Sequence, residues 1–333
     1  MIDLYLITGA VGHLGSALAR VLVGAGKSVR GFDREGCGPV PEGVEMFFGD
    51  VTDPETLVDF LHKPGESTRL ILIHCAGIVS ISSRYDPRVY QVNVVGTQVV
   101  LNAAIEAGVD RFIYVSSVHA IPEKPHGNLI AEVDHFDPDQ VIGGYAKTKA
   151  EASQYVIDRA SQAGLEYVIV HPSGLMGPYD DGHGHISALI IDYYRGRLTS
   201  GVNGGYDFVD VRDVVQGIIA AAQCGRSGEC YILSGRYYRV RELLDMVSAV
   251  TGRKPIRHFL PIWFVKATAP FSEIYYRLRK VPPLYTSYSI YTLESNANFT
   301  NEKAVRDLGY TVRPLEETLH DTVDWFRAEG LIV

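Results

Sequence analysis

The sequence has few cysteines, and their spacing excludes two common uses of that residue. Its 333 residues include four cysteines, which form neither a CxxC motif nor a metal-ligand spacing. We expect free thiols in a reducing compartment, with Cys75 acting as a small apolar residue of a buried strand. His183 and His185 have no third ligand nearby, so the sequence predicts no metal site.

The chain also lacks an excess of positive charge and any long apolar run. It carries 31 Lys and Arg against 39 Asp and Glu, a net charge of −8, without a basic tail. Nucleic acid is therefore not an expected partner. No apolar run approaches the length of a transmembrane helix, and the first predicted strand begins too early for a signal peptide to precede it. We expect a cytoplasmic protein without an integral membrane segment.

What the sequence does contain is a strand, a glycine-rich turn, a helix and a second strand within residues 2–33. The apolar run at 4–7 is typical of a strand buried on both faces. Gly9, Gly12 and Gly15 follow it. In this context one glycine permits a tight turn, one lets the backbone approach a pyrophosphate, and one lets helix and strand pack closely. The N-terminus of the helix offers free N–H groups to the phosphates.

An acidic residue ends the second strand, 18 residues after the last of these glycines. Asp33 is placed to accept hydrogen bonds from both hydroxyls of an adenosine ribose and to repel a 2′-phosphate. It therefore predicts NAD rather than NADP as the cofactor. Arg34 beside it leaves NADP open, because its guanidinium would neutralise that phosphate.

Strands and helices alternate along the rest of the first two thirds of the chain. Apolar segments predict further strands at 44–48, 69–75, 111–115, 166–171 and 230–233. This order predicts an α/β protein with a Rossmann-type doubly wound parallel sheet and a smaller, mixed C-terminal substrate domain. We expect residues 1–177 to form the nucleotide-binding domain, with 207–235 returning to it, and residues 178–206 and 236–333 to form the substrate-binding domain.

Several small or polar residues lie just beyond predicted strand ends, where open parallel sheets bind their ligands. Asp50 is placed to hydrogen-bond an adenine amino group, whereas the role of a plain turn acid suits Asp53 better. The small residues 76–77 would let a cofactor pass close to the backbone. Asn93 lies in a helix predicted at 86–107, where a surface role and a backbone-anchoring or proton-relay role are equally open.

A Tyr-x-x-x-Lys pair opens the helix predicted at 145–163. Tyr145 and Lys149 are four residues apart and share a helix face. A phenol titrates at about 10 in water, and a nearby ammonium is expected to lower the pKa of Tyr145, which then exchanges a proton with a hydroxyl or carbonyl oxygen. Lys149 would also hold the nicotinamide ribose. Ser117 would hydrogen-bond the same substrate oxygen, and Lys147 faces the surface.

The order of these motifs resembles the extended short-chain dehydrogenase/reductase superfamily over nearly the whole chain. The matching segments are TGAVGHLG, Asp33, GDVTD, HCAG, NVVGT, YVSS, YAKTK and HPSGLMGP. The resemblance implies a catalytic triad of Ser117, Tyr145 and Lys149, and a homodimer that pairs helices 86–107 and 142–163. It also implies cofactor contacts from Gly9, Gly12, His13, Leu14, Asp33, Arg34, Asp50, Val51, Cys75, Ala76, Gly77, Asn93, Ser116, Tyr145, Lys149, Pro172 and Gly174.

Within the superfamily the chain is most similar to 3β-hydroxysteroid dehydrogenases and dihydroflavonol-type reductases. The segments PSGLMGP, FVDVRDVV and LGYTVRPLEETLHDTVDWF carry this similarity. The branch usually has an arginine where this chain has His171, so that arginine contact is not expected here. Nucleotide-sugar epimerases often place an asparagine where this chain has Gly174, which disfavours a nucleotide-sugar substrate.

Residues 256–291 are rich in aromatic side chains and leave three alternatives open. They line a pocket for a flat apolar ligand, they pack as an ordinary core, or a surface helix at 262–280 touches a membrane. Glu273 interrupts the apolar face of that helix, which makes the third alternative the weakest. Candidate substrate contacts outside this segment are Ser80, His119, Tyr206 and Arg212.

Together these motifs predict an NAD(P)-dependent oxidoreductase that interconverts a secondary alcohol and a ketone. The expected substrate is apolar and polycyclic, such as a steroid- or flavonoid-like compound, and Tyr145 is the expected acid and base. The alternatives are a nucleotide-sugar epimerase or dehydratase that retains NAD, and a non-catalytic dinucleotide-sensing regulator. The intact triad disfavours the regulator.

Overall fold

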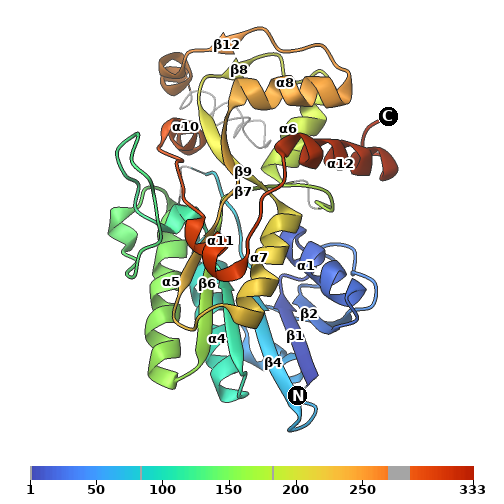
Figure 1. Ribbon diagram of the computed structural model, residues 1–333, viewed down its shortest axis with the longest axis vertical. Coiled ribbons are helices and arrows are strands. Elements are labelled where there is room, and N and C mark those ends of the chain that lie inside the picture. The colour runs from blue at the N-terminus through green and yellow to red at the C-terminus, as the bar shows by residue number, and fades with distance from the viewer. Residues whose placement is uncertain (1, 83–84, 182–183, 269–285) are drawn as a thin grey trace.

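A seven-stranded parallel sheet forms the centre of the larger part of the molecule (Figure 1). The computed structural model describes residues 2–82, 85–181, 184–268 and 286–333. The strands are ordered β10-β6-β5-β4-β1-β2-β3. Their bounds are β1 Ile2–Thr8, β2 Ser28–Asp33, β3 Glu45–Phe48, β4 Thr68–His74, β5 Arg111–Val115, β6 Glu166–Pro172 and β10 Cys230–Leu233. The expected doubly wound α/β fold is confirmed.

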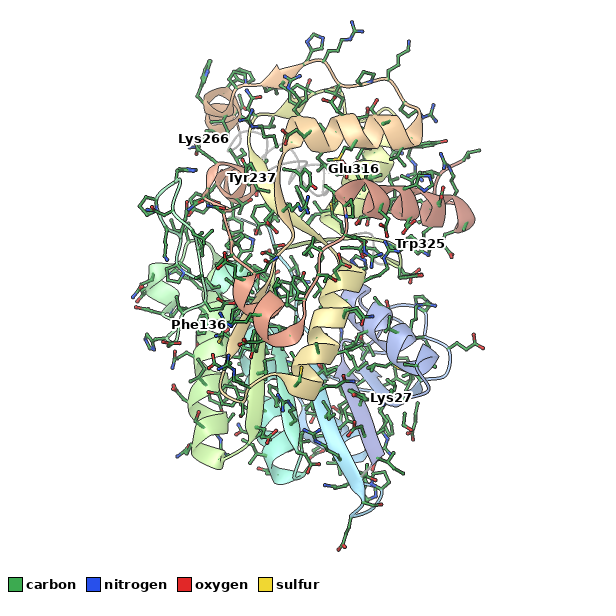
Figure 2. All side chains as sticks on the ribbon, viewed as in Figure 1. Lys27, Phe136, Tyr237, Lys266, Glu316 and Trp325 are labelled. Atoms are coloured by element: carbon green, nitrogen blue, oxygen red, sulfur yellow. The ribbon has the colours of Figure 1, made fainter. Side chains whose placement is uncertain are left out.

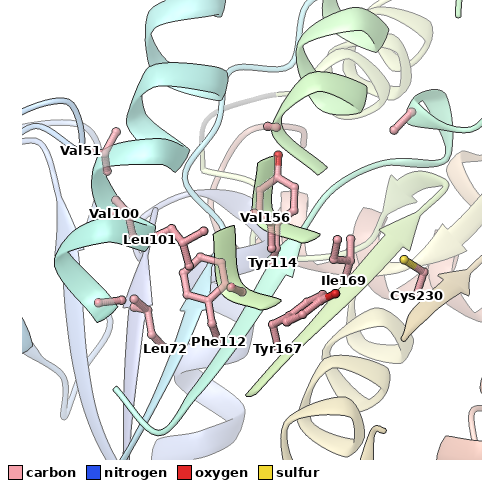
Figure 3. Close-up of a cluster of buried hydrophobic side chains, with 14 of the residues drawn as sticks. Val51, Leu72, Val100, Leu101, Phe112, Tyr114, Val156, Tyr167, Ile169 and Cys230 are labelled. Carbon is pink, nitrogen blue, oxygen red and sulfur yellow. The ribbon is translucent and has the colours of Figure 1, made fainter. Parts of the chain in front are cut away.

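Helices cover both faces of this sheet because successive strand residues point to opposite sides. The covering helices are α1 His13–Gly24, α4 Thr97–Glu106, α5 Gly144–Ala163, α7 Val211–Cys224 and α11 Glu302–Leu308. Leu4 and Leu6 of β1 pack in one core with α4 and α5, whereas Tyr5 and Ile7 pack in another with α1, α7 and α11. Figure 3 shows the first core, where side chains of α4 and α5 meet those of β4, β5 and β6.

The helix expected at 86–107 is interrupted in the middle. α3 (Pro87–Tyr90) leads into a π-helical turn, η2 (Gln91–Gly96), and α4 follows. A Cβ on Gly96 would lie 2.8 Å from Cγ2 of Val51, so the bare backbone there lets the loop after β3 approach. Asn93 in this turn is buried, and π-helical turns often occur at functional sites. The other short helical turns are η1 Pro54–Leu57, α2 Val58–Leu61, η3 Val118–Ala120 and η4 Pro138–Gln140.

A three-stranded sheet forms the centre of the smaller part of the molecule. Its order is β11-β9-β7, with β7 Gly174–Met176, β9 Gly205–Asp210 and β11 Arg236–Arg239. Within residues 207–235, which we expected to return to the nucleotide-binding domain, β9 pairs with β7 and β11, whereas β10 pairs with β6 of the large sheet. β9 contributes to both cores because its side chains alternate: Phe208 packs into the smaller core and Val209 into the core beneath α7.

The remaining helices pack around this small sheet. They are α6 His185–Tyr194, α8 Val240–Thr251, α10 Ser287–Glu294 and α12 Leu315–Ala328, and a two-stranded sheet joins β8 Gly201–Val202 to β12 Phe259–Leu260. Their shared core contains Leu243 and Val247 of α8 and Leu319 and Phe326 of α12. None of the helices in the described ranges is long and apolar enough to cross a membrane.

Candidate active site

The glycine-rich turn after β1 has the geometry that the sequence predicted. Gly9 has φ 71°, and a Cβ there would lie 2.7 Å from the backbone N of Ala76. A Cβ on Gly15 would lie 2.0 Å from the Gly9 carbonyl oxygen, so helix and turn meet through bare backbone. Gly12 caps α1 without a side-chain hydrogen bond, which leaves the first N–H groups to bind phosphate oxygens. Leu14 anchors that first turn in the core.

Two carboxylates lie at the ends of β2 and β3. Asp33 accepts hydrogen bonds from the N–H groups of Val11, at 3.0 Å, and Arg34, at 2.9 Å, which fix its carboxylate beside the glycine turn. Asp50 accepts from the N–H and the hydroxyl of Thr52 through one oxygen, and these bonds, with the Arg34 guanidinium, lower its pKa. Asp50 therefore has a turn role of its own, which we had expected only of Asp53.

The backbone that follows β4 passes between Asn93 and Lys149. A Cβ on Gly77 would lie 3.3 Å from Asn93 Oδ1 and 3.4 Å from Lys149 Nζ. Asn93 Oδ1 accepts the Ile78 N–H at 2.7 Å, and Asn93 Nδ2 donates to the Ile78 carbonyl oxygen at 3.0 Å. Asn93 Nδ2 also donates to the Thr148 hydroxyl of α5 at 3.2 Å. Of the roles left open for Asn93, the structure supports the backbone anchor.

A buried chain of hydrogen bonds below this loop joins β1, β4 and η2. The Ala76 N–H donates to Thr8 Oγ1 (3.3 Å), which contacts His74 Nδ1 (2.7 Å), while His74 Nε2 contacts Thr97 Oγ1 (3.1 Å). Thr97 donates to the Asn93 carbonyl oxygen at 2.7 Å, so His74 must donate from Nε2 and accept at Nδ1. Burial lowers the pKa of His74 to about 3, which keeps the ring neutral. The HCAG motif contains His74, but sequence spacing does not reveal these contacts.

The two serines after β5 have different partners. Ser116 Oγ lies 2.8 Å from Ser153 Oγ, which donates to the Lys149 carbonyl oxygen at 2.7 Å. Ser116 therefore fastens β5 to α5, and since its N–H donates to the Val170 carbonyl oxygen at 2.8 Å, its own carbonyl oxygen is the group left to contact a cofactor. The Ser117 side chain caps η3 and lies close enough to the Tyr145 hydroxyl to lower the pKa of that phenol. The structure thus brings the predicted triad together.

Tyr145 and Lys149 share the buried face of α5, as their spacing predicted, but their electrostatics differ from the expectation. Lys149 Nζ donates to the Val115 carbonyl oxygen at 2.9 Å and lies 5.1 Å from the centre of the Tyr114 ring. Burial lowers the pKa of Lys149 to about 8 and raises the pKa of Tyr145 to about 12, the second shift being opposed by the Ser117 hydroxyl. The expected lowering of the Tyr145 pKa is therefore wrong, because burial is the largest influence on this phenol and raises its pKa.

Three aromatic side chains from distant parts of the chain gather beside Tyr145, and we call them the aromatic wall: His119, Tyr206 and Tyr288. The ring centre of His119 lies 6.0 Å from that of Tyr145, 5.7 Å from that of Tyr206 and 6.2 Å from that of Tyr288. His119 Nε2 is 2.9 Å from the Tyr206 hydroxyl, and burial lowers the pKa of His119 to about 4. Ser80 lines a small pocket with Tyr145. Three of the four predicted substrate contacts therefore lie at the triad.

Tyr288 was not among the site residues predicted from the sequence. It lies in the first turn of α10, and its ring would meet a Cβ on Gly143 at 2.1 Å. Gly143 also has φ 105°, a conformation that side chains other than glycine rarely adopt. The glycine pair 143–144 immediately before Tyr145 is the sequence signal that another element approaches closely there.

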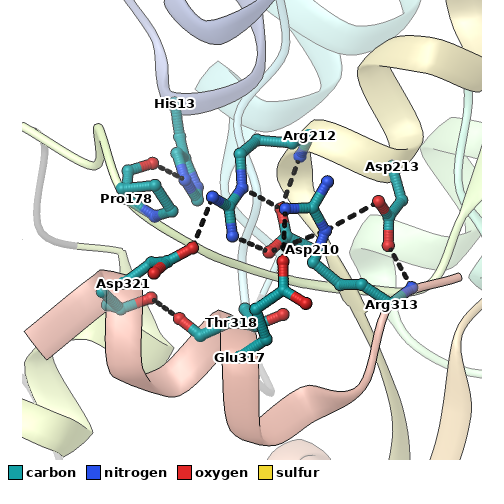
Figure 4. A network of polar contacts seen from close by, with 10 residues as sticks. His13, Pro178, Asp210, Arg212, Asp213, Arg313, Glu317, Thr318 and Asp321 are labelled. Carbon is teal, nitrogen blue, oxygen red and sulfur yellow. Dashed lines mark hydrogen bonds and ion pairs between the residues drawn. The ribbon is translucent and has the colours of Figure 1, made fainter.

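The fourth predicted substrate contact, Arg212, lies instead in an ion-pair network (Figure 4). Its guanidinium donates to both carboxylate oxygens of Asp210, at 3.0 and 2.7 Å, and to Asp321 of α12 at 2.6 Å. Figure 4 shows His13 of α1 beside this network, with Nε2 3.0 Å from the Pro178 carbonyl oxygen. Arg212 therefore tethers α12 to the start of α7, which corrects the role expected for it.

The end of β6 supports the triad from behind. Pro172 ends β6 and Gly174 begins β7, so both lie at the carboxyl edge of the large sheet. His171, where the branch usually has arginine, donates from Nδ1 to the Ser117 carbonyl oxygen at 3.0 Å and stacks on Phe136. Burial lowers the pKa of His171 to about 4, so it braces Ser117 as a neutral ring. Residue type alone did not reveal this contact.

The cysteine and histidine expectations were tested in part. All four cysteines are free, and burial raises the pKa of the Cys75 thiol to about 12, in agreement with an inert residue. His183 lies outside the described residues, and His185 begins α6. Among the residues that the structure describes, no group of three or more side chains is arranged to hold a metal ion.

The aromatic-rich segment is described only at its two ends. Phe271, Tyr275, Tyr276 and Tyr285, with the rest of 269–285, lie outside the described residues, so the helix expected at 262–280 is seen only from 262 to 268. Phe259 packs beside the core of α8, whereas Tyr288 contacts the start of α5. The described ends thus contain both a core residue and a residue of the candidate site.

Known proteins resemble this chain over its full length. The model of the NAD dependent epimerase/dehydratase family matches residues 5–234. Sterol demethylase protein B of Methylococcus capsulatus is 32% identical over 336 residues, covering 98% of this chain and 99% of that protein. A putative dihydroflavonol 4-reductase of Synechocystis sp. is 29% identical, covering 100% and 97%. The crystal structure of gox2253 is 33% identical with a TM-score of 0.82, covering 99% and 100%.

These similarities agree with the resemblance inferred from the motifs. The matched segment contains the glycine turn, Asp33 and the residues Ser117, Tyr145 and Lys149. The protein is an NAD(P)-dependent oxidoreductase of the extended short-chain dehydrogenase/reductase type, and it belongs to the NAD dependent epimerase/dehydratase family.

Proposed function

We propose that this protein interconverts a secondary alcohol and a ketone on an apolar, polycyclic substrate. The observation that carries the proposal is the position of Tyr145, whose ring lies 6.0 Å from His119 of the aromatic wall and whose hydroxyl faces Ser117. Rings of this kind suit a flat apolar ligand. The names of two relatives, a sterol demethylase protein and a putative dihydroflavonol 4-reductase, agree with such a substrate.

The nucleotide end fits NAD. The turn at Gly9 and Gly12 is bare backbone at the N-terminus of α1, which suits a pyrophosphate, and the fixed Asp33 carboxylate suits the two ribose hydroxyls. NAD supplies or accepts the hydride. We propose NAD over NADP because Asp33, held by two backbone N–H groups, would repel a 2′-phosphate.

The triad handles the proton. With a pKa of about 12, Tyr145 is a neutral phenol at physiological pH and is ready to donate its proton to a carbonyl oxygen. The Ser117 hydroxyl positions that oxygen. Lys149, with a pKa of about 8, is mostly protonated near neutral pH, and its charge stabilises the phenolate left after donation. Asn93 holds the Ile78 backbone and Thr148 in place beside them.

The charges around Tyr145 favour this substrate class over a nucleotide sugar. His119 is neutral because burial lowers its pKa to about 4, and burial raises the pKa values of Tyr206 and Tyr288, so the wall carries no charge at neutral pH. A diphosphate would need cations to replace its hydration. Arg212, the nearest arginine in sequence to Tyr206, is already paired with two carboxylates.

The His119–Tyr206 pair of the wall leaves one hydrogen-bond donor without a partner among the described residues. His119 and Tyr206 share a single hydrogen bond, and in either direction one proton remains: on His119 Nδ1 if Tyr206 donates, or on the Tyr206 hydroxyl if His119 donates. We infer that the substrate carries a second oxygen close to the reacting carbon. The substrate contacts are thus Tyr145 and Ser117 for the first oxygen and the His119–Tyr206 pair for the second.

Turnover of probe compounds tests the proposal. We expect NADH oxidation with polycyclic ketones such as 3-ketosteroids and 3-hydroxyflavanone, with loss of turnover but not of NADH binding in Tyr145→Phe. Epimerisation of UDP-sugars with tightly retained NAD would contradict it in favour of the epimerase alternative. Unchanged biological activity of the Tyr145→Phe variant would favour the regulator instead.

We further propose that the protein acts in the cytoplasm as a homodimer. The free cysteines support a reducing compartment. The family resemblance supports pairing through the helices at 86–107 and 142–163, which correspond to α3–α4 and α5. Sedimentation at working concentration tests this pairing, and a monomer would contradict it.

A further inference from the structure

One end of the smaller part of the molecule combines exposed aromatic rings with positive charge. Residues 252–268, here called the basic–aromatic segment, run from the end of α8 through β12 into a helical stretch at 262–268. Figure 1 places α8 and β12 at the end of the molecule opposite the N-terminus. The segment therefore lies on the side of the smaller part that faces away from the large sheet and is available to a partner of its own.

Two large apolar side chains of this segment face outward. Trp263 is 68% exposed and Phe264 is 42% exposed, and their rings meet edge to face at 5.8 Å. Val265, the next residue, is fully buried, so the helical stretch has a fixed inner face and presents Trp263 and Phe264 on its outer side. Adjacent exposed aromatics of this size mark an interaction surface.

The segment that carries these rings is opposite in charge to the whole protein. The segment contains four basic residues and no acidic one, whereas the chain has a net charge of −8. Arg253, Lys254, Arg257 and Lys266 are all exposed. Figure 2 shows Lys266 at this end of the molecule, where it pairs with Glu294 of α10. The surface is thus complementary to a negatively charged, partly apolar partner.

We propose that the basic–aromatic segment docks on the surface of a bilayer that contains anionic lipids. Tryptophan and phenylalanine side chains insert at the level of the headgroups, where one side of the ring is apolar and the other is wet. Lysine and arginine side chains elsewhere on the same segment bind lipid phosphates and keep their apolar stems against the interface. A two-fold contact with a second copy fits the segment less well, because it would bring the same basic residues of both copies face to face.

The docked surface is connected to the active site through one helix. Val265 packs against Ile290 of α10, and Tyr288 of the same helix belongs to the aromatic wall beside Tyr145. A steroid- or flavonoid-like substrate dissolves preferentially in a bilayer. Docking at this end therefore brings the site close to the phase that holds such a substrate. The inference goes beyond the proposed function and does not depend on turnover.

A single-tryptophan variant tests the docking directly. The chain has two tryptophans, and Trp325→Phe leaves Trp263 as the one tryptophan whose emission is followed. We expect its emission to shift to shorter wavelength with vesicles of phosphatidylcholine and phosphatidylglycerol, and to be quenched when the acyl chains are brominated. The protein should float with these vesicles and not with phosphatidylcholine alone, and added salt should release it.

Surface variants identify the contacts. Trp263→Ala with Phe264→Ala, and separately Lys254→Glu with Arg257→Glu, should each lower the bound fraction at least tenfold, by loss of insertion and of charge attraction respectively. Tyr237→Ala, which removes another exposed aromatic on β11, is the matched control and should bind as before.

Absence of flotation, or flotation unchanged by both double variants, would overturn the proposal. So would a smaller assembly size of the Trp263→Ala variant without lipid, which would mean that a second copy covers this surface. Because no measurement involves turnover, these outcomes are separate from failure of the proposed function.

Discussion

The two ends of the active site are built in different ways. The end proposed for the nucleotide is one continuous segment, residues 9–33, whose contacts are made mainly by the backbone. Gly9, Gly12 and Gly15 place bare peptide units against each other, and Asp33 is fixed by backbone N–H groups. The substrate end consists of side chains that four separate segments supply, among them His119 and Tyr288. A site made from local backbone leaves a pattern in the sequence, whereas a site made from distant side chains does not.

The largest expected effect separates catalysis from nucleotide binding. Tyr145→Phe removes the proton donor, so kcat should fall roughly a thousandfold, as is typical for loss of a general acid, while NADH affinity stays close to that of the wild type. Steady-state kinetics and NADH fluorescence titration measure the two quantities. Tyr155→Phe, on the same helix and bonded to Asn102, is the matched control. Equal loss of NADH binding in Tyr145→Phe would show that the two ends are not separable.

The next effect tests whether the nucleotide end depends on bare backbone. In Gly9→Ala the new Cβ would lie 2.7 Å from Ala76 N, so we expect about 3 kcal/mol lower unfolding free energy and a large loss of NADH affinity. Gly26→Ala shares the same φ of 71° but meets nothing within 4 Å, so it isolates backbone strain and should cost only about 1 kcal/mol. Equal costs in denaturant melts would refute the steric explanation.

A third prediction concerns a buried carboxyl next to the substrate end. Asp207 accepts the Gly235 N–H, and burial raises its pKa from 3.8 to about 6. The folded state therefore binds a proton more tightly than the unfolded state, so this contribution to stability is complete below pH 4 and is lost as pH rises through 6. Asp207→Asn keeps the acceptor without the charge and should raise the unfolding free energy by roughly 2 kcal/mol at pH 7.5.

That gain should vanish at low pH. At pH 4 the wild-type carboxyl is protonated in the folded state, so thermal melts of wild type and Asp207→Asn should nearly coincide. Asp139→Asn, at an exposed carboxylate paired with Lys147, serves as the control and should show no comparable pH dependence. A stability difference of the same size at both pH values would contradict the role of burial.

The smallest expected effect sharpens the assignment of the substrate end. Tyr206→Phe removes the hydroxyl that hydrogen-bonds His119, so kcat/KM for 3-hydroxyflavanone should fall about tenfold, whereas flavanone, which lacks the 3-hydroxyl, should change little. 3-Hydroxyflavanone and flavanone differ in one hydroxyl, and NADH oxidation measures the turnover of both. Equal losses for both probes would show that Tyr206 only shapes the pocket.

Particular residues show how far the sequence could be read. The seven strands of the large sheet, the glycine turn, Asp33 and the pairing of Tyr145 with Lys149 follow from local spacing, and the structure has them all. The pairing of β9 with β7 and β11 was missed because a short strand with two buried faces fits either sheet. The Tyr145 pKa was assigned the wrong direction because burial depends on the whole fold.

Two further residues depended on contacts across the chain. Arg212 was assigned to the substrate, but Asp321, more than a hundred residues away, takes its guanidinium. Tyr288 was one of many aromatic residues in its segment, and only its packing on Gly143 distinguishes it. Such contacts have no local periodicity, so spacing rules do not detect them.

The hydrogen-bond chain through Thr8, His74 and Thr97 has one more consequence. Each of its hydroxyls both receives and passes on one proton, and both ends are backbone groups whose direction cannot change, so the chain has a single allowed proton ordering. A hydrogen-bond network with a single proton ordering cannot switch to another ordering when the loop at 76–78 is displaced. β1, β4 and the π turn therefore keep a fixed spacing, which gives the loop at 76–78 a rigid support on the side where we propose that the cofactor lies.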